Sequence, residues 1–95
     1  MANLDDVAKA YPYDSIPDIS DADFAKEVKD IVDAIAKRKG ITTDGASQEV
    51  AQDLGVSKPS IDRWSEGKRM PPQVTRKAIH KDIQDRIRKK YDFQL

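Results

Sequence analysis

The sequence predicts an all-α protein, a small bundle of four or five helices preceded by an N-terminal arm. Apolar residues recur every three or four positions in the segments 20–39 and 72–90, which is the spacing of an amphipathic helix. Between them, the segment 47–66 carries two shorter runs of this spacing around one glycine. The length of 95 residues indicates a single domain, and the absence of cysteine excludes disulfides and thiolate metal sites.

The charges are distributed asymmetrically, although the formal net charge is zero. Residues 1–36 hold nine acidic and three basic side chains, whereas residues 37–95 hold fourteen basic and eight acidic ones. A basic part beside an acidic segment is typical of a protein that binds a polyanion. A surface of mixed charge without any partner is an equally good interpretation of the charges alone.

Residues 1–19 are predicted to form an acidic arm. Its two prolines exclude a helix longer than about Leu4–Ala10. The arm either lies loosely on the core or contacts a partner through Tyr11 and Tyr13. The sequence leaves both interpretations open.

The domain itself is predicted to span residues 20–90. Ser20 followed by Asp23 is typical of a helix start, and Gly40 after three basic residues is typical of a helix end. The helix between them carries an apolar stripe that we expect to face the core, formed by Phe24, Val28, Ile31 and Ile35.

Two short helices are predicted next. Ile41–Gly45 is expected to be a connector that contains cap or turn residues, and the second helix should then run from residue 46 or 47 to Leu54. Gly55 supplies the left-handed conformation that a tight turn requires. Ser57 is a suitable N-cap for a third helix over residues 58–66.

A long helix over residues 72–90 completes the domain, followed by a C-terminal tail, 91–95. We expect its many basic side chains to form a solvated face, although they could also extend a DNA-binding surface. Its apolar face either makes a homodimer contact, alone or with the tail, or is buried within a monomer against Phe24–Ile35. That face is lined by Ile79, Ile83 and Ile87.

The segment 47–72 carries a small residue, a glycine and apolar residues at a fixed spacing, namely Ala51, Gly55, Val56, Ile61 and Trp64, followed by EGKRMPP. With this pattern the chain resembles, over roughly residues 24–72, the lambda Cro/C1-type helix-turn-helix family of phage and bacterial regulators. Two features depart from the family. The connector Ile41–Gly45 is longer than usual, and Ser47 stands where the family often has Gln, with Gln48 beside it.

The resemblance implies sequence-specific binding of double-stranded DNA by a transcriptional regulator, such as a repressor, with the helix 58–66 in the major groove. Arg63 can pair with guanine, and Lys58 can bind guanine or phosphate. Asp62 can accept from cytosine, orient Arg63 or cap locally. The candidate DNA-binding residues are Gln48, Ser57, Lys58, Pro59, Ser60, Asp62, Arg63, Lys68 and Arg69.

The alternative is a protein-interaction module on the same fold, either an antitoxin-like partner or a phage structural or packaging factor. We expect no enzyme, because the chain has no cysteine nucleophile and no Gly-rich phosphate loop, and His80 alone cannot build a zinc site. No cofactor, metal or small-molecule ligand is predicted. The chain has neither a long apolar run nor a signal-peptide pattern, so we expect a cytoplasmic protein.

Overall fold

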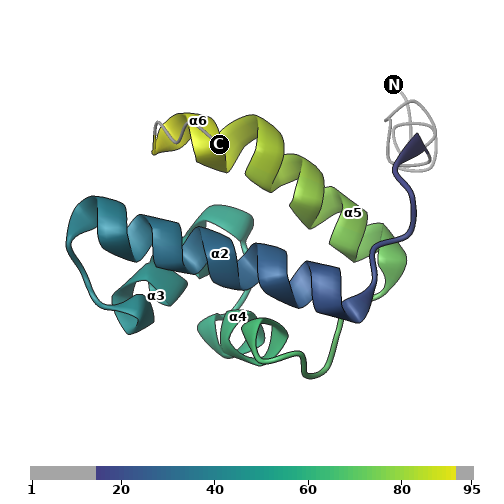
Figure 1. Cartoon of the computed structure of the whole chain (residues 1–95), viewed down its shortest axis with the longest axis horizontal. Helices are drawn as coiled ribbons and strands as arrows, with labels where there is room; N and C mark the ends of the chain where they lie inside the picture. The colour runs from purple at the N-terminus through teal and green to yellow at the C-terminus, as the bar shows by residue number, and fades with distance from the viewer. Residues whose placement is uncertain (1–14, 92–95) are drawn as a thin grey trace.

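The computed structural model describes residues 15–91, and every regular element in this range is a helix (Figure 1). The prediction of an all-α fold is confirmed. The predicted helix Leu4–Ala10, the contact through Tyr11 and Tyr13, and the tail after Tyr91 lie outside the described residues. In chain order the elements are α2 (Asp21–Lys39), α3 (Thr43–Leu54), α4 (Lys58–Ser65), α5 (Gln73–Asp82), a π-helical segment η2 (Ile83–Ile87) and α6 (Arg88–Lys90).

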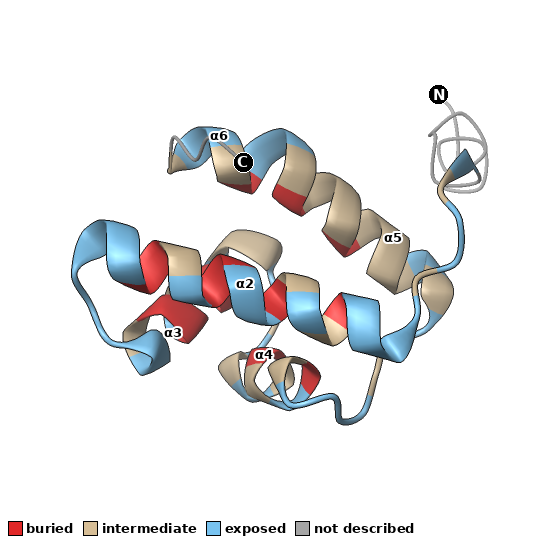
Figure 2. Cartoon of the chain, viewed as in Figure 1, coloured by how far each residue is buried: buried red, intermediate tan, exposed pale blue. Residues whose placement is uncertain are grey.

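The helix α2 is the centre of the molecule. The helices α5 and α6 lie along one side of it, α4 lies on the opposite side, and α3 crosses α2 between them (Figure 1). Buried residues accordingly face inward from α2, α3, α4, α5 and η2 (Figure 2). The predicted start and end of α2 are confirmed, since the Ser20 hydroxyl accepts from the Asp23 amide at 3.1 Å and Gly40 adopts φ 66°.

The helix α3 begins at Thr43, three or four residues earlier than predicted. Thr42 is its N-cap, because the Thr42 hydroxyl accepts a hydrogen bond from the Gly45 amide at 3.0 Å. Most of the predicted connector Ile41–Gly45 is therefore the cap and first turn of the helix. The connector between α2 and α3 is accordingly shorter than the sequence predicted.

The last three elements form one continuous helix that begins at Gln73, one residue after the predicted start. Its hydrogen bonds widen to the π-helical register over Ile83–Ile87, which the sequence did not predict. Both isoleucines that bound this segment are buried, at 1% and 0% exposure.

The isoleucine face of this helix is buried within a single chain, since Ile79 is also only 6% exposed. These three side chains belong to the same core cluster as Phe24 and Ile35. Of the two predicted arrangements, the structure shows the one in which a single chain buries the isoleucine face. The three side chains therefore retain little exposed surface for a homodimer contact.

The expectation of a solvated basic face on this helix is wrong for several of its residues. Arg76 Nη2 lies 2.8 Å from Asp21 Oδ1, and Lys77 Nζ lies 2.8 Å from Asp18 Oδ1. The Gln73 side chain both accepts from the Ile19 amide and donates to its carbonyl, at 2.8 Å each. Residues 18–21, where the acidic arm joins α2, are thus bound to the first two turns of α5.

The other end of the helix is tied to α3. The Tyr91 hydroxyl donates to Asp53 Oδ2 at 2.9 Å, and Lys90 Nζ pairs with the same carboxylate at 2.5 Å. Partial burial and the hydrogen bond to Asp53 raise the pKa of the Tyr91 phenol. Over residues 15–91, no helix is long and apolar enough to span a membrane.

Candidate nucleic-acid interface

The helix α4 has one buried and one exposed face. Ile61 is fully buried and Trp64 is 8% exposed, with the indole ring packed edge-on against Phe24 at a centroid distance of 5.6 Å. Pro59 and Arg63 lie on the exposed face. The core contacts therefore fix which side of α4 is available to a partner.

The turn between α3 and α4 has the geometry that the sequence predicted. Gly55 adopts φ 70°, and the Val56 amide donates to the Ala51 carbonyl at 2.9 Å. The Ser57 hydroxyl caps α4 by accepting from the Ser60 amide at 3.3 Å. The Ser57 and Ser60 hydroxyls also bond each other at 2.8 Å, so both candidate base contacts are engaged locally.

Lys58 is held between two carboxylates, one from α3 and one from α4. Its Nζ lies 2.6 Å from Asp44 Oδ1 and 2.7 Å from Asp62 Oδ2. The hydrogen bonds to Asp44 and Asp62 raise the pKa of Lys58. Asp62 therefore pairs with Lys58, whereas the sequence predicts that it accepts from cytosine, orients Arg63 or caps locally.

Asp44 is a residue of this face that sequence reasoning missed. The four-residue spacing of Lys58 and Asp62 signals a pair on one helix. Asp44 lies fourteen positions before Lys58 and comes into contact only because α3 packs against α4. No local pattern could have found it.

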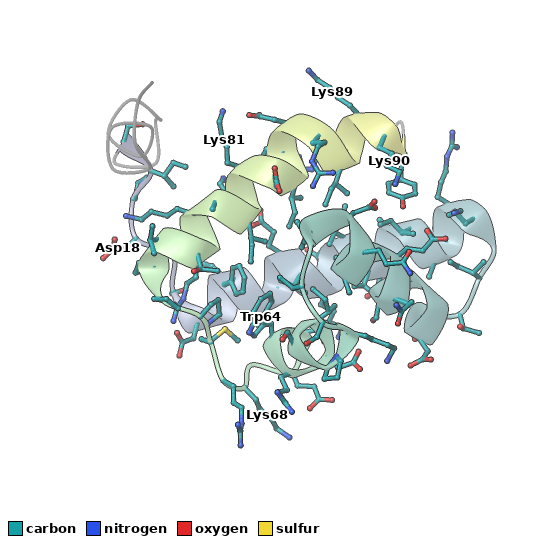
Figure 3. All side chains as sticks on the ribbon, turned by 180° about the vertical axis from the view of Figure 1, so that it is seen from behind. Asp18, Trp64, Lys68, Lys81, Lys89 and Lys90 are labelled. Atoms are coloured by element: carbon teal, nitrogen blue, oxygen red, sulfur yellow. The ribbon has the colours of Figure 1, made fainter. Side chains whose placement is uncertain are left out.

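The loop after α4 carries two exposed cations. It begins with Gly67 at φ 78°, whose amide donates to the Trp64 carbonyl at 3.0 Å. The Trp64 indole in turn donates to the Arg69 carbonyl at 3.1 Å. The buried tryptophan thus anchors the loop that presents Lys68 beside α4 (Figure 3). Arg69 follows Lys68 in this loop and is also exposed.

These cations differ in their partners. Lys68 Nζ lies 3.3 Å from Glu66 Oε2, with both side chains largely exposed. Within residues 15–91, neither Arg63 nor Arg69 forms an ion pair. The two guanidinium groups are the cations of this face that remain available without breaking an existing pair.

Positions 47 and 48 of α3 differ in burial. Ser47 is 6% exposed and packs inside, whereas Gln48 is exposed on α3. The first turn of α3 is also exposed at Thr43 and Asp44. Gln48, in the second turn of α3, is therefore accessible to a partner, whereas Ser47 is not.

The basic residues of α5 and α6 do not join this face. These helices lie on the side of α2 opposite to α4, and Lys89 and Lys68 point away from each other in Figure 3. Over residues 15–91, no three carboxylate or histidine side chains gather as metal ligands. The half-buried His80 instead contacts Glu27 Oε2 through Nδ1 at 2.7 Å.

Comparison with known proteins adds no assignment. No protein-family model, no curated protein and no solved structure matches this chain significantly.

Proposed function

We propose that this protein binds double-stranded DNA in a sequence-specific manner and regulates transcription, as the phage and bacterial regulators that it resembles do. In this proposal α3, the turn 55–57 and α4 act as a helix-turn-helix, with α4 in the major groove. The fold on its own is also compatible with other partners, so the proposal depends on the polar face of α4.

One observation carries the proposal. The apolar side of α4 is fixed in the core, while Arg63 is exposed on α4 and Lys68 and Arg69 are exposed in the loop that follows it. A guanidinium at mid-helix suits bidentate contact with guanine, and cations beside the helix suit the flanking phosphates. The Gln48 side chain, exposed on α3, supports a further phosphate contact.

Substitutions of the proposed base contact and of the proposed phosphate contact should affect DNA binding differently. Arg63→Ala should relax base preference, because it removes a base contact worth about 1–3 kcal/mol of discrimination. Lys68→Ala should weaken binding to all duplexes alike and make the salt dependence shallower. Lys89→Ala is the matched control, since Lys89 is exposed on α6, away from the proposed interface.

The measurement is fluorescence anisotropy of the purified protein with a random duplex and with duplexes selected from a randomised pool, across salt concentrations. A regulator with several phosphate contacts should lose affinity steeply as salt rises. Absence of binding to every duplex at low salt would overturn the proposal. If Arg63→Ala and Lys68→Ala affect all sequences equally, α4 does not read bases.

A protein-interaction module is the second candidate function. It is favoured by the carboxylates of the same face, since Asp44, Asp62 and Glu66 stand among the proposed DNA-binding cations. Such a mixed face suits a protein partner of complementary charge pattern. Loss of all duplex binding at low salt would favour this candidate.

A further inference from the structure

The carboxylates beside Lys58 are a feature that DNA binding alone does not explain. The Lys58 side chain is 24% exposed, whereas its partner Asp44 is 82% exposed and Asp62 is 42% exposed. The Lys58 side chain is therefore about three-quarters covered, and two more exposed carboxylates lie beside its ammonium group. A phosphate that approaches Lys58 meets negative charge first.

The carboxylates nearly balance the cations on this face, so they affect how strongly it can attract phosphate. The four cations of the face are opposed by three carboxylates: Lys58, Arg63, Lys68 and Arg69 against Asp44, Asp62 and Glu66. Like charges brought together on association are costly and suppress wrong partners. A complex with DNA must offset the repulsion between phosphates and these carboxylates before Lys58 can contribute.

We propose that Asp44 and Asp62 form a carboxylate gate on Lys58, which withholds this cation from non-cognate DNA and releases it only on a duplex that satisfies the other contacts. This inference rests on the proposed function and deepens it. On a non-cognate duplex, Lys58 stays paired and adds no phosphate contact. On the cognate duplex, the base contacts offset the cost of separating the pair.

The gate raises specificity at the expense of affinity. Discrimination between partners depends on a difference of free energies, so a repulsive group that acts mainly on the wrong partner increases it. Asp44 and Asp62 are accordingly positioning residues that act through Lys58. Because hydrogen bonds to both carboxylates raise the pKa of Lys58, the lysine stays protonated at neutral pH and the gate does not depend on its titration.

The test is the double variant Asp44→Asn/Asp62→Asn, measured against a random duplex by anisotropy at about 50 mM and 200 mM salt. Release of Lys58 adds one phosphate contact, which should enlarge the ratio of the two affinities about 3-fold. The preference for a selected duplex over the random one should fall. Asp30→Asn is the matched control, because Asp30 forms the same kind of pair with Lys26, at 2.6 Å on α2.

A third variant separates release of Lys58 from simple loss of repulsion. Adding Lys58→Gln to the double variant should abolish the gain, since the released cation is then absent. If the gain persists without Lys58, or if Asp30→Asn produces it too, the gate is overturned. Because Asp44 lies in the first turn of α3, thermal unfolding is measured for each variant, and Asp62→Asn alone serves as the test if the double variant does not fold.

The outcomes distinguish the gate from the proposed function. If the wild-type protein binds DNA and the double variant shows the same affinities and salt dependence, the gate fails and the proposed function stands. If neither protein binds at low salt, both fail. If only the double variant binds, through Lys58, the two carboxylates block Lys58 on every duplex, so both the release on a cognate duplex and the proposed function fail.

Discussion

The side chains around α4 show how a neighbour changes the role of a residue. From the sequence alone Lys58 is a cation that could bind phosphate or guanine. In the structure its ammonium group is already paired with two carboxylates. Ser57 and Ser60 offer hydroxyls that already bond each other. No carboxylate in the described range lies within ion-pair distance of Arg63 or Arg69, so both guanidinium groups are free of such a pair. Position in the fold, more than residue type, decides which cations of this face are paired.

Arg69 is also held in an unusual backbone conformation. Among the non-glycine residues of the range 15–91, it alone has a positive φ, of 50°. Side chains other than glycine resist this left-handed region. The hydrogen bond from the Trp64 indole to the Arg69 carbonyl helps to hold the loop in it.

A pair of substitutions measures this strain. Arg69→Gly should be more stable than Arg69→Ala by about 1 kcal/mol, because glycine adopts the positive φ without a steric cost. The order should reverse at Lys68, where φ is not positive. The measurement is urea unfolding of all four variants, and a preference for alanine at both positions would contradict the prediction.

The helices begin and end where side-chain and glycine caps place them. Ser20, Thr42 and Ser57 each accept a hydrogen bond from the amide three residues later. Ser20 and Ser57 were predicted, since each stands before a clear apolar pattern. The start of α3 was placed too late because Thr42, Thr43 and Asp44 are all suitable caps, and only the packed helix selects among them.

The N-cap of α3 can be tested with two neighbouring threonines. Thr42→Ala should cost about 1 kcal/mol of stability, because the Gly45 amide loses its acceptor. Thr43→Ala should change the free energy of unfolding by less than about 0.5 kcal/mol. Chemical denaturation compares the two variants, and equal losses would mean that Thr42 does not cap the helix.

The charge asymmetry of the whole chain has a partly intramolecular explanation. Acidic residues near the start of the domain pair with basic residues of α5, as Asp18 does with Lys77 and Asp21 with Arg76. At the other end, Lys90 and Tyr91 bind Asp53. The excess of positive charge in the second half therefore overstates the surface that is free to bind a polyanion.

The burial of the isoleucine face predicts which substitutions on this helix lower the free energy of unfolding. Ile83→Val should cost about 1 kcal/mol, because it removes a methyl group from the core. Val74→Ala on the same helix is the control, since Val74 is 62% exposed and should cost less than about 0.5 kcal/mol.

The unfolding midpoint should not depend on protein concentration, as expected if one chain buries this face alone. Urea unfolding at two concentrations about tenfold apart tests this. A midpoint that rises with concentration would instead indicate a homodimer.

Local patterns in the sequence were sufficient for the helical class, the core stripe of α2, the glycine turn at Gly55 and the exposed face of α4. These features depend on residue spacing and backbone conformation, which act over a few positions. The π-helical segment, the pairing of Asp44 with Lys58 and the ties between the acidic segment and α5 depend on contacts between residues far apart in the chain. Such contacts exist only once the helices have packed, because packing determines which charges meet and which remain exposed.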